Sequence, residues 1–130
     1  DLDAVLKQHD MDQIFLLAPT STDERIQHVV KQASGFIYYV SLKGVTGAAT
    51  LDTAEAAARI AKIKTHTNVP VGVGFGISDA ASAKAMGQVA DAVIVGSALV
   101  KPFATLAIDQ AVDQTVNKIK ELRAALDELV

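Results

Sequence analysis

Four short apolar runs, each followed by a helical pattern, constrain the fold of this chain more than any other feature of it. Runs of this length suit strands that are buried on both faces, as in a parallel sheet. Strands that alternate with helices predict an α/β fold with right-handed crossover connections. The runs are Ile14–Leu17, Phe36–Ser41, Val69–Val73 and Ala92–Val95.

Helical patterns precede the first run and follow each of the four. The first is expected over Asp1–His9 and the last, which is also the longest, over Asp109–Leu129. Hydroxyl side chains that can cap the helices after the first three runs are Ser21, Thr53 and Ser78. Glu24 follows Ser21 by three residues, as in a capping box. The apolar stripe of the last helix is expected to face inward and consists of Val112, Val116, Ile119, Leu122, Leu126 and Leu129.

Two of the runs end in small turns that predict a phosphate site. The turns are Gly74-Phe75-Gly76 and Gly96-Ser97, and each opens into a helical pattern. Glycine lets the backbone approach a ligand closely, and a helix N-terminus presents unpaired N–H groups. In (β/α)8 barrels such a site lies after the last two strands. One turn alone would simply end a strand, but two favour a small phosphorylated metabolite bound by backbone N–H groups and the Ser97 hydroxyl.

A long connection and a pair of tyrosines are further candidates. The segment Leu42–Leu51 is long for a strand-to-helix loop and contains Gly44-Val45-Thr46-Gly47. It fits a surface loop and a substrate-covering lid equally well, with Thr46 as the side chain able to bond a catalytic group. Tyr38 and Tyr39 are neighbours in a strand and point to opposite faces. The inward one could line a pocket, although spacing alone slightly favours two core aromatics.

Composition excludes several classes of function. A net charge of −3 over 130 residues argues against a nucleic-acid partner, and the length predicts a single domain over residues 1–130. Without cysteine there is no disulfide framework or thiolate zinc site. No apolar run approaches the roughly 18 residues of a membrane span, so a cytoplasmic protein is expected. The three histidines are far apart and are expected on the surface, and no metal-ligand spacing or Ser/His/Asp pattern emerges.

Four motifs together resemble the α chain of tryptophan synthase. They are Ile14–Ser21, Tyr38–Ser41 with Gly44–Gly47, Gly74–Ser78 and Val95–Lys101. They cover the chain in the expected order and spacing, and Ser-x-x-Gly-Val-Thr-Gly at 41–47 is the most specific. The resemblance implies a (β/α)8 barrel and a lyase of tryptophan biosynthesis that cleaves indole-3-glycerol phosphate to indole and glyceraldehyde 3-phosphate. It also implies a β chain as partner, which carries pyridoxal phosphate, so this chain needs no cofactor.

Site residues follow from the same resemblance, position by position. The residues that would hold the phosphate are Gly47, Phe75, Gly76, Gly96 and Ser97. Thr46 would be the lid residue that orients a catalytic aspartate, and Tyr38 would line the indole end of the pocket. No metal site is implied.

The resemblance further implies that this chain is only a C-terminal half-barrel, equivalent to strands five to eight. In the family, four more strands stand upstream, and the catalytic glutamate and aspartate lie in that half. We therefore expect no useful lyase activity from this chain alone, because neither the acid nor the base of the cleavage is present. Unpaired parallel edges invite pairing, which predicts self-association, for example as a homodimer of half-barrels.

Other interpretations remain open on the sequence. One is the corresponding half of a different phosphate-binding barrel, such as a thiamine-phosphate synthase or a histidine-pathway isomerase. The Gly-Val-Thr-Gly segment argues against both. Another is a non-catalytic phosphate-binding or scaffold module, which differs from an enzyme fragment because adding a missing half would restore no activity.

Overall fold

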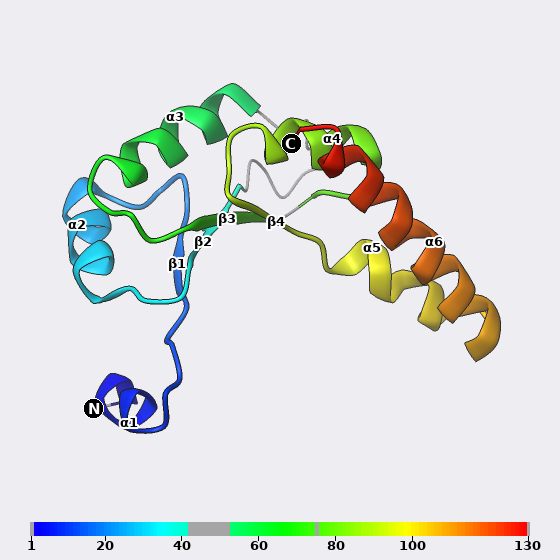
Figure 1. Cartoon of the computed structure of the whole chain (residues 1–130), viewed down its shortest axis with the longest axis horizontal. Helices are drawn as coiled ribbons and strands as arrows, with labels where there is room; N and C mark the ends of the chain where they lie inside the picture. Colours follow the sequence, from blue (N-terminus) through cyan, green and yellow to red (C-terminus); the bar gives the residue numbers. More distant parts are fainter. Residues whose placement is uncertain (1, 42–52, 75, 130) are drawn as a thin grey trace.

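Strands and helices alternate along the chain, as the apolar runs predict (Figure 1). The computed structural model describes residues 2–41, 53–74 and 76–129. The strands are β1 (Phe15–Leu17), β2 (Ile37–Val40), β3 (Val71–Gly74) and β4 (Ala92–Ile94). The helices are α1 (Leu2–Gln8), α2 (Asp23–Gln32), α3 (Thr53–Lys64), α4 (Ala80–Gly87), α5 (Ser97–Val100), the 3-10 helix η1 (Lys101–Ala104) and α6 (Ile108–Asp127).

The four strands form one parallel sheet in the order of the sequence. Phe15 of β1 lies opposite Ile37 of β2, and Ile37 lies opposite Val71 of β3. Gly72 of β3 pairs with Ala92 of β4. Every connection between neighbouring strands therefore crosses over, and β1 and β4 form the two edges of the sheet.

The helices begin close to the predicted positions, but the residues that cap them differ from those predicted. Thr22 caps α2, because its Oγ1 accepts a hydrogen bond from the Arg25 N–H at 3.2 Å. The predicted cap Ser21 was wrong: its Oγ accepts from the Ala18 N–H at 3.0 Å and closes the turn before the helix. Thr53, predicted as a cap, is instead the first residue of α3.

The cap of α4 is Asp79 and not the predicted Ser78. The Asp79 carboxylate accepts from the Ser82 N–H at 2.8 Å, and the Ser82 hydroxyl accepts from the Asp79 N–H at 3.2 Å. This reciprocal pair is a capping box, and a carboxylate at this end is also favoured by the helix dipole.

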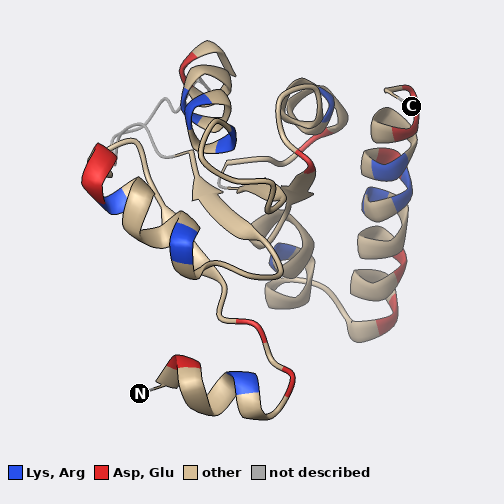
Figure 2. Cartoon of the chain, turned by 60° about the vertical axis from the view of Figure 1, so that its left-hand side comes forward, with Lys and Arg blue, Asp and Glu red and all other residues tan. Residues whose placement is uncertain are grey.

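The core lies on one face of the sheet, where the helices cover alternate strand residues. Tyr39 and Ile37 of β2 are fully buried there, as are Val71 and Val73 of β3. The helix residues in the same cluster are Ile26, Val29, Ala56, Ile60, Ile63, Ala83, Met86 and Leu122. Charged side chains lie on helices and connections, and the strands carry none (Figure 2).

The opposite face is only partly covered. Leu16 of β1 points to this face and is 58% exposed. A Cβ added to Gly72 would lie 3.1 Å from Ile94 Cδ1 and 3.3 Å from the Phe36 ring, so these side chains close in over β3. Gly74 leaves room for the same kind of cover, because a Cβ there would collide with the Tyr38 hydroxyl unless that side chain moved.

The inward stripe predicted for the last helix is only partly confirmed. Leu122 is buried, but Val112, Val116 and Ile119 are between 42% and 48% exposed. The buried line of α6 instead runs through Ala111, Leu122 and Ala125, since small alanines allow close approach to neighbouring helices. The apolar face of α6 is thus wider than the surface that covers it. Within the described residues, no helix has the length and apolar content that a membrane crossing requires.

Candidate functional site

A hollow of about 350 Å³ lies where β2, β3 and β4 end. It is within the size range of small-molecule sites, roughly 300–1,000 Å³. Its lining residues are Tyr38, Gly76, Ile77, Ile94, Gly96 and Ser97. Since the carboxyl ends of parallel strands meet at one edge of the sheet, residues distant in sequence converge here, as they do in barrel enzymes.

Two glycines, Gly76 and Gly96, line this hollow. Gly76 has a φ of +74°, a left-handed conformation that other residues rarely adopt. Gly96 has a φ of −115°, and a Cβ built there would meet nothing within 4 Å. Glycine at position 96 is therefore needed neither to avoid a neighbouring atom nor to allow a left-handed φ. Its effect is to leave free space beside Ser97.

Ser97 begins α5 and lies between two hollows. The Gly96 carbonyl accepts from the Leu99 N–H at 2.9 Å, which fixes the turn that presents Ser97. Ser97 also lines a neighbouring hollow of about 490 Å³, together with Ser78 and Lys101. Among the described residues that line the two hollows, Lys101 is the one that carries a charge. The sequence interpretation gave Lys101 no role, although it closes the Val95–Lys101 motif.

The amino end of α4 is already occupied by an anion. The Asp79 carboxylate lies there, and its pKa is lowered by the hydrogen bond from the Ser82 N–H. The prediction that both turns open into helix ends with unpaired N–H groups therefore needs correction for this turn. After β3, Gly76 lines the hollow, and the polar groups that it can offer a ligand are those of its backbone.

The tyrosine pair is divided between the two faces of the sheet, as alternation predicts. Tyr38 is half-buried and lines the hollow. Tyr39 is 1% exposed and lies in the core, and this burial raises the pKa of its phenol. The Tyr39 hydroxyl has no hydrogen-bond partner among the described residues.

The structure brings four of the predicted site residues together around one hollow: Tyr38, Gly76, Gly96 and Ser97. The other three, Thr46, Gly47 and Phe75, lie outside the described residues. The same holds for the proposed lid over 42–51.

The described residues that line the hollow include no carboxylate and no imidazole. His9, His28 and His66 are exposed, as predicted. Across the described residues, no cluster of three or more His, Cys, Asp or Glu could hold a metal ion. What this arrangement can do is bind and orient a small anion.

The family described as tryptophan synthase alpha chain matches residues 1–129. The chain belongs to this family. The tryptophan synthase alpha chain of Acinetobacter baylyi is 90% identical over 130 residues, which is all of this chain and 49% of that protein. The Acinetobacter baumannii protein is 88% identical over 127 residues, 98% of this chain and 48% of that protein. This match favours the tryptophan synthase family over the other barrel enzymes considered from the sequence.

Solved structures agree. Tryptophan synthase from Mycobacterium tuberculosis, in an open form, matches with a TM-score of 0.79 and 33% identity over 95% of this chain and 44% of that one. The alpha chain from Legionella pneumophila matches with a TM-score of 0.76 and 28% identity over 97% of this chain and 46% of that one. The chain spans about half the length of the relatives it matches, and its four-stranded sheet is half of their (β/α)8 barrel.

Proposed function

We propose that this chain supplies the phosphate-binding half of a tryptophan synthase α chain, the lyase that cleaves indole-3-glycerol phosphate to indole and glyceraldehyde 3-phosphate. The observation that carries the proposal is the hollow at the strand ends, with Gly76, Gly96 and Ser97 around it in a chain of this family. Its place in the fold is where barrel enzymes bind phosphate groups.

Each site residue has a proposed role in binding. Backbone N–H groups at Gly76 and Gly96 and the Ser97 hydroxyl hold the phosphate, and Lys101 adds a positive charge beside it. Tyr38 lines the indole end of the pocket, and its hydroxyl lies directly over Gly74. From outside the described residues, Gly47 and Phe75 contribute further phosphate contacts, and Thr46 orients a catalytic aspartate.

The chemistry itself is proposed to need the other half of the barrel. Cleavage requires an acid that protonates the indole ring and a base that takes the hydroxyl proton of the glycerol chain. The described residues that line the hollow include no carboxylate or imidazole, so the chain alone is proposed to bind without turning over. In the complete protein a β chain with pyridoxal phosphate would take up the indole. Charged metabolites of this kind fit the cytoplasm as the place of reaction.

Phosphate binding is tested by titrating the isotope-labelled chain with inorganic phosphate and with glycerol 3-phosphate, using glycerol as the uncharged control. We expect amide shifts at Gly76, Gly96 and Ser97 with the two anions and none with glycerol. Ser97→Ala should weaken binding about tenfold, since it removes a hydrogen bond to a charged group. Ser78→Ala, which alters the neighbouring hollow only, is the matched control. Shifts confined to other residues would refute the site.

An indole-release assay, run with and without an added upstream half-barrel, distinguishes an enzyme fragment from a non-catalytic binding module. The module is a real alternative because no carboxylate or imidazole is among the described residues that line the hollow. Activity only after addition supports the lyase fragment. Phosphate binding with no activity in either case supports the module, and turnover by the chain alone would mean that one of its own carboxylates does the chemistry.

The chain is also proposed to take a second copy of itself as a partner when no upstream half is present. No described strand pairs with the outer side of β1 or of β4, and unpaired edges favour association.

A further inference from the structure

The two turns that border the hollow are built on glycine. Gly74 ends β3 and Gly76 follows it in the first turn, while Gly96 precedes α5 in the second. Glycine has more backbone freedom than any other residue, so a turn built on it keeps one shape only if something else restrains it. Helix α5 has four residues, too few to be stable alone, and Gly96 offers it no side-chain cap. Restraint of both turns must therefore come from other elements.

Ser41, the residue after β2, restrains the first turn. Its N–H and its hydroxyl both donate to the Gly74 carbonyl, each at 3.0 Å. A carbonyl oxygen has two lone pairs, so both are used here. The N–H bond continues the ladder between β2 and β3, whereas the hydroxyl bond is additional and comes from a side chain 33 positions away. The chain that leaves β3 toward Gly76 is thereby fastened to the end of β2.

Thr115 of α6 restrains the second turn through α5. Its hydroxyl donates to the Leu99 carbonyl at 3.1 Å, across 16 positions of the sequence. A threonine inside a helix can instead return its hydroxyl to a carbonyl of its own preceding turn, so this bond is directed at the neighbouring element. Because the Gly96 carbonyl accepts from the Leu99 N–H, holding Leu99 also holds the turn that presents Ser97.

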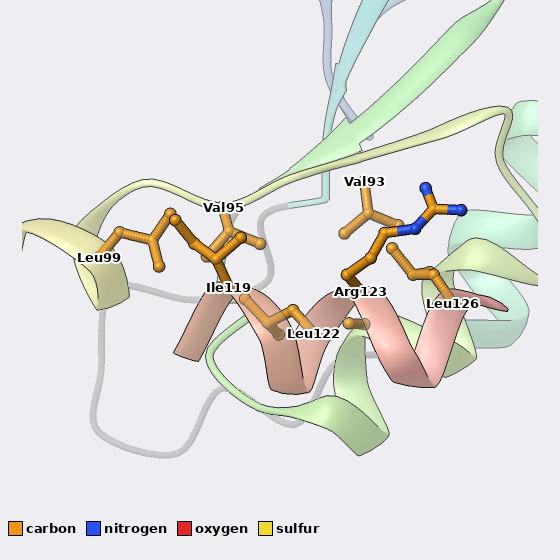
Figure 3. A pocket seen from close by; sticks show the side chains of 8 residues that line it. Val93, Val95, Leu99, Ile119, Leu122, Arg123 and Leu126 are labelled. Atoms are coloured by element: carbon orange, nitrogen blue, oxygen red, sulfur yellow. The ribbon is translucent and has the colours of Figure 1, made fainter. Parts of the chain in front are cut away.

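The side chain of Leu99 is held by the same helix as its carbonyl. It lies in an apolar groove of about 330 Å³ between α6 and the chain that runs from β4 to α5, which Val95 and Ile119 also line (Figure 3). Ile119 is four residues after Thr115 and therefore lies on the same face of α6. Apolar contacts have no preferred direction, whereas a hydrogen bond does, so the Thr115 hydroxyl is the contact that orients α5.

We propose that Ser41 and Thr115 are positioning residues of the phosphate site, each orienting one of its two turns. Neither is among the described residues that line the hollow, so each acts through the backbone that it holds and not by touching the ligand. A ligand that meets two turns already oriented has less ordering to impose on them, which raises its affinity. This inference rests on the phosphate site of the proposed function and adds the two residues that shape it.

The test measures the affinity of the isotope-labelled chain for glycerol 3-phosphate and the amide resonances of the two turns. Ser41→Ala and Thr115→Ala should each weaken binding about fivefold, because each removes one restraining hydrogen bond. Without ligand, Ser41→Ala should move the amide resonance of Gly76 and leave that of Ser97 in place, and Thr115→Ala should do the reverse. Ser41→Thr and Thr115→Ser keep the hydroxyl and should restore most of the affinity.

Thr65→Ala is the matched control. The Thr65 hydroxyl also donates to a backbone carbonyl, that of Lys62 at 2.7 Å, but Thr65 lies between α3 and the start of β3, at the end of the sheet opposite the hollow. Its removal should leave the phosphate affinity unchanged. Urea unfolding at one protein concentration measures how much stability each variant loses. If affinity followed this stability loss and not the place of the substitution, the two hydroxyl bonds would be structural only.

The possible failures of this inference and of the phosphate site are distinct. Wild-type affinity in both alanine variants would overturn the inference and leave the site standing, and so would equal losses in the alanine variants and in Ser41→Thr and Thr115→Ser. A loss in one alanine variant alone would overturn the role of the other residue. If the wild-type chain bound no glycerol 3-phosphate, or bound it through other residues, the proposed function would fail and this inference with it.

Discussion

Asp91 joins the starts of two strands and the end of a helix, and its removal should cost more than the loss of an ordinary surface ion pair. One of its carboxylate oxygens accepts from the Val71 N–H at 2.8 Å, and the other accepts from Lys64 Nζ at 2.6 Å. Its own N–H donates to the Val71 carbonyl. The first N–H of β3 therefore depends on a side chain that lies twenty residues along the sequence.

The expected loss follows from these two contacts. A hydrogen bond to a charged group is worth about 1.5–3 kcal/mol, and a partly exposed ion pair about 0–1 kcal/mol. Asp91→Ala should thus lower the free energy of unfolding by about 2–3 kcal/mol. Asp91→Asn keeps an acceptor for the Val71 N–H and should cost about 1 kcal/mol. Lys64→Ala removes the ion pair alone and should cost at most about 1 kcal/mol.

The pH dependence has a definite sign. Burial by itself would raise the pKa of Asp91, but hydrogen bonds from Lys64 and from the Val71 N–H outweigh it and hold the pKa below its usual value. The folded state then binds fewer protons, so the contribution is complete above the unfolded pKa of about 3.9 and is lost as the pH falls through the folded pKa. The difference between wild type and Asp91→Asn should be present at pH 7 and shrink below about pH 4.

Urea unfolding followed by circular dichroism at pH 7 and pH 3, at one protein concentration, measures these differences. The reasoning would be refuted if Asp91→Ala cost no more than Lys64→Ala at pH 7. That result would mean that the Val71 N–H finds another partner or that the carboxylate contributes only through the ion pair.

Three further substitutions test individual contacts by the same unfolding assay. Gly74→Ala should cost about 2 kcal/mol or more, because the new methyl group would collide with the Tyr38 hydroxyl; an unchanged stability would show that Tyr38 can move aside at little cost. Thr22→Ala should cost about 1 kcal/mol by removing the cap of α2, and no loss would show that this cap is not needed. Tyr39→Phe should be neutral or slightly stabilising, since it removes a buried hydroxyl without a described partner, whereas a loss above about 1.5 kcal/mol would reveal one.

The sequence predicted the alternation of strands and helices because hydrophobic run length and period are local properties. It failed at helix caps for a reason that is equally local. Ser21 and Thr22 are both good capping residues, and only the extended backbone of Thr22 decides between them. Ser78 and Asp79 present the same choice, and Asp79 is the cap.

The last helix shows a limit that is not local. An apolar stripe identifies the face that avoids water, but it does not say which neighbour covers that face. Ile119 and Val116 belong to the predicted stripe and remain exposed, while Ala111 and Ala125 lie outside it and are buried. The rest of the stripe can be covered only by residues from outside this half-barrel. The periodicity of the sequence does not identify those residues.

The candidate site was more predictable than the packing of α6, because the topology of the sheet alone brings the site residues together. Once the strands are parallel and in sequence order, Gly76 and Gly96 must end at the same edge of the sheet. The inward direction of Tyr38 follows from alternation together with the burial of Tyr39. Lys101 was missed because a lysine at the end of a helical turn is ordinarily a surface residue, and its place beside Ser97 depends on how α5 continues into η1.

Closure of the sheet and phosphate binding should be coupled, because both depend on the incompletely covered face. Tyr38 and Ile94 line the hollow from this face, on which Leu16 is exposed. A second half-barrel would exclude water from the hollow, and charge interactions strengthen as water is removed. Phosphate should therefore tighten the association of this chain with an upstream half-barrel, and by linkage that association should strengthen phosphate binding by the same factor. Equal phosphate affinity of the chain with and without an added upstream half-barrel, measured by titration, would show that closure of the sheet and phosphate binding are independent.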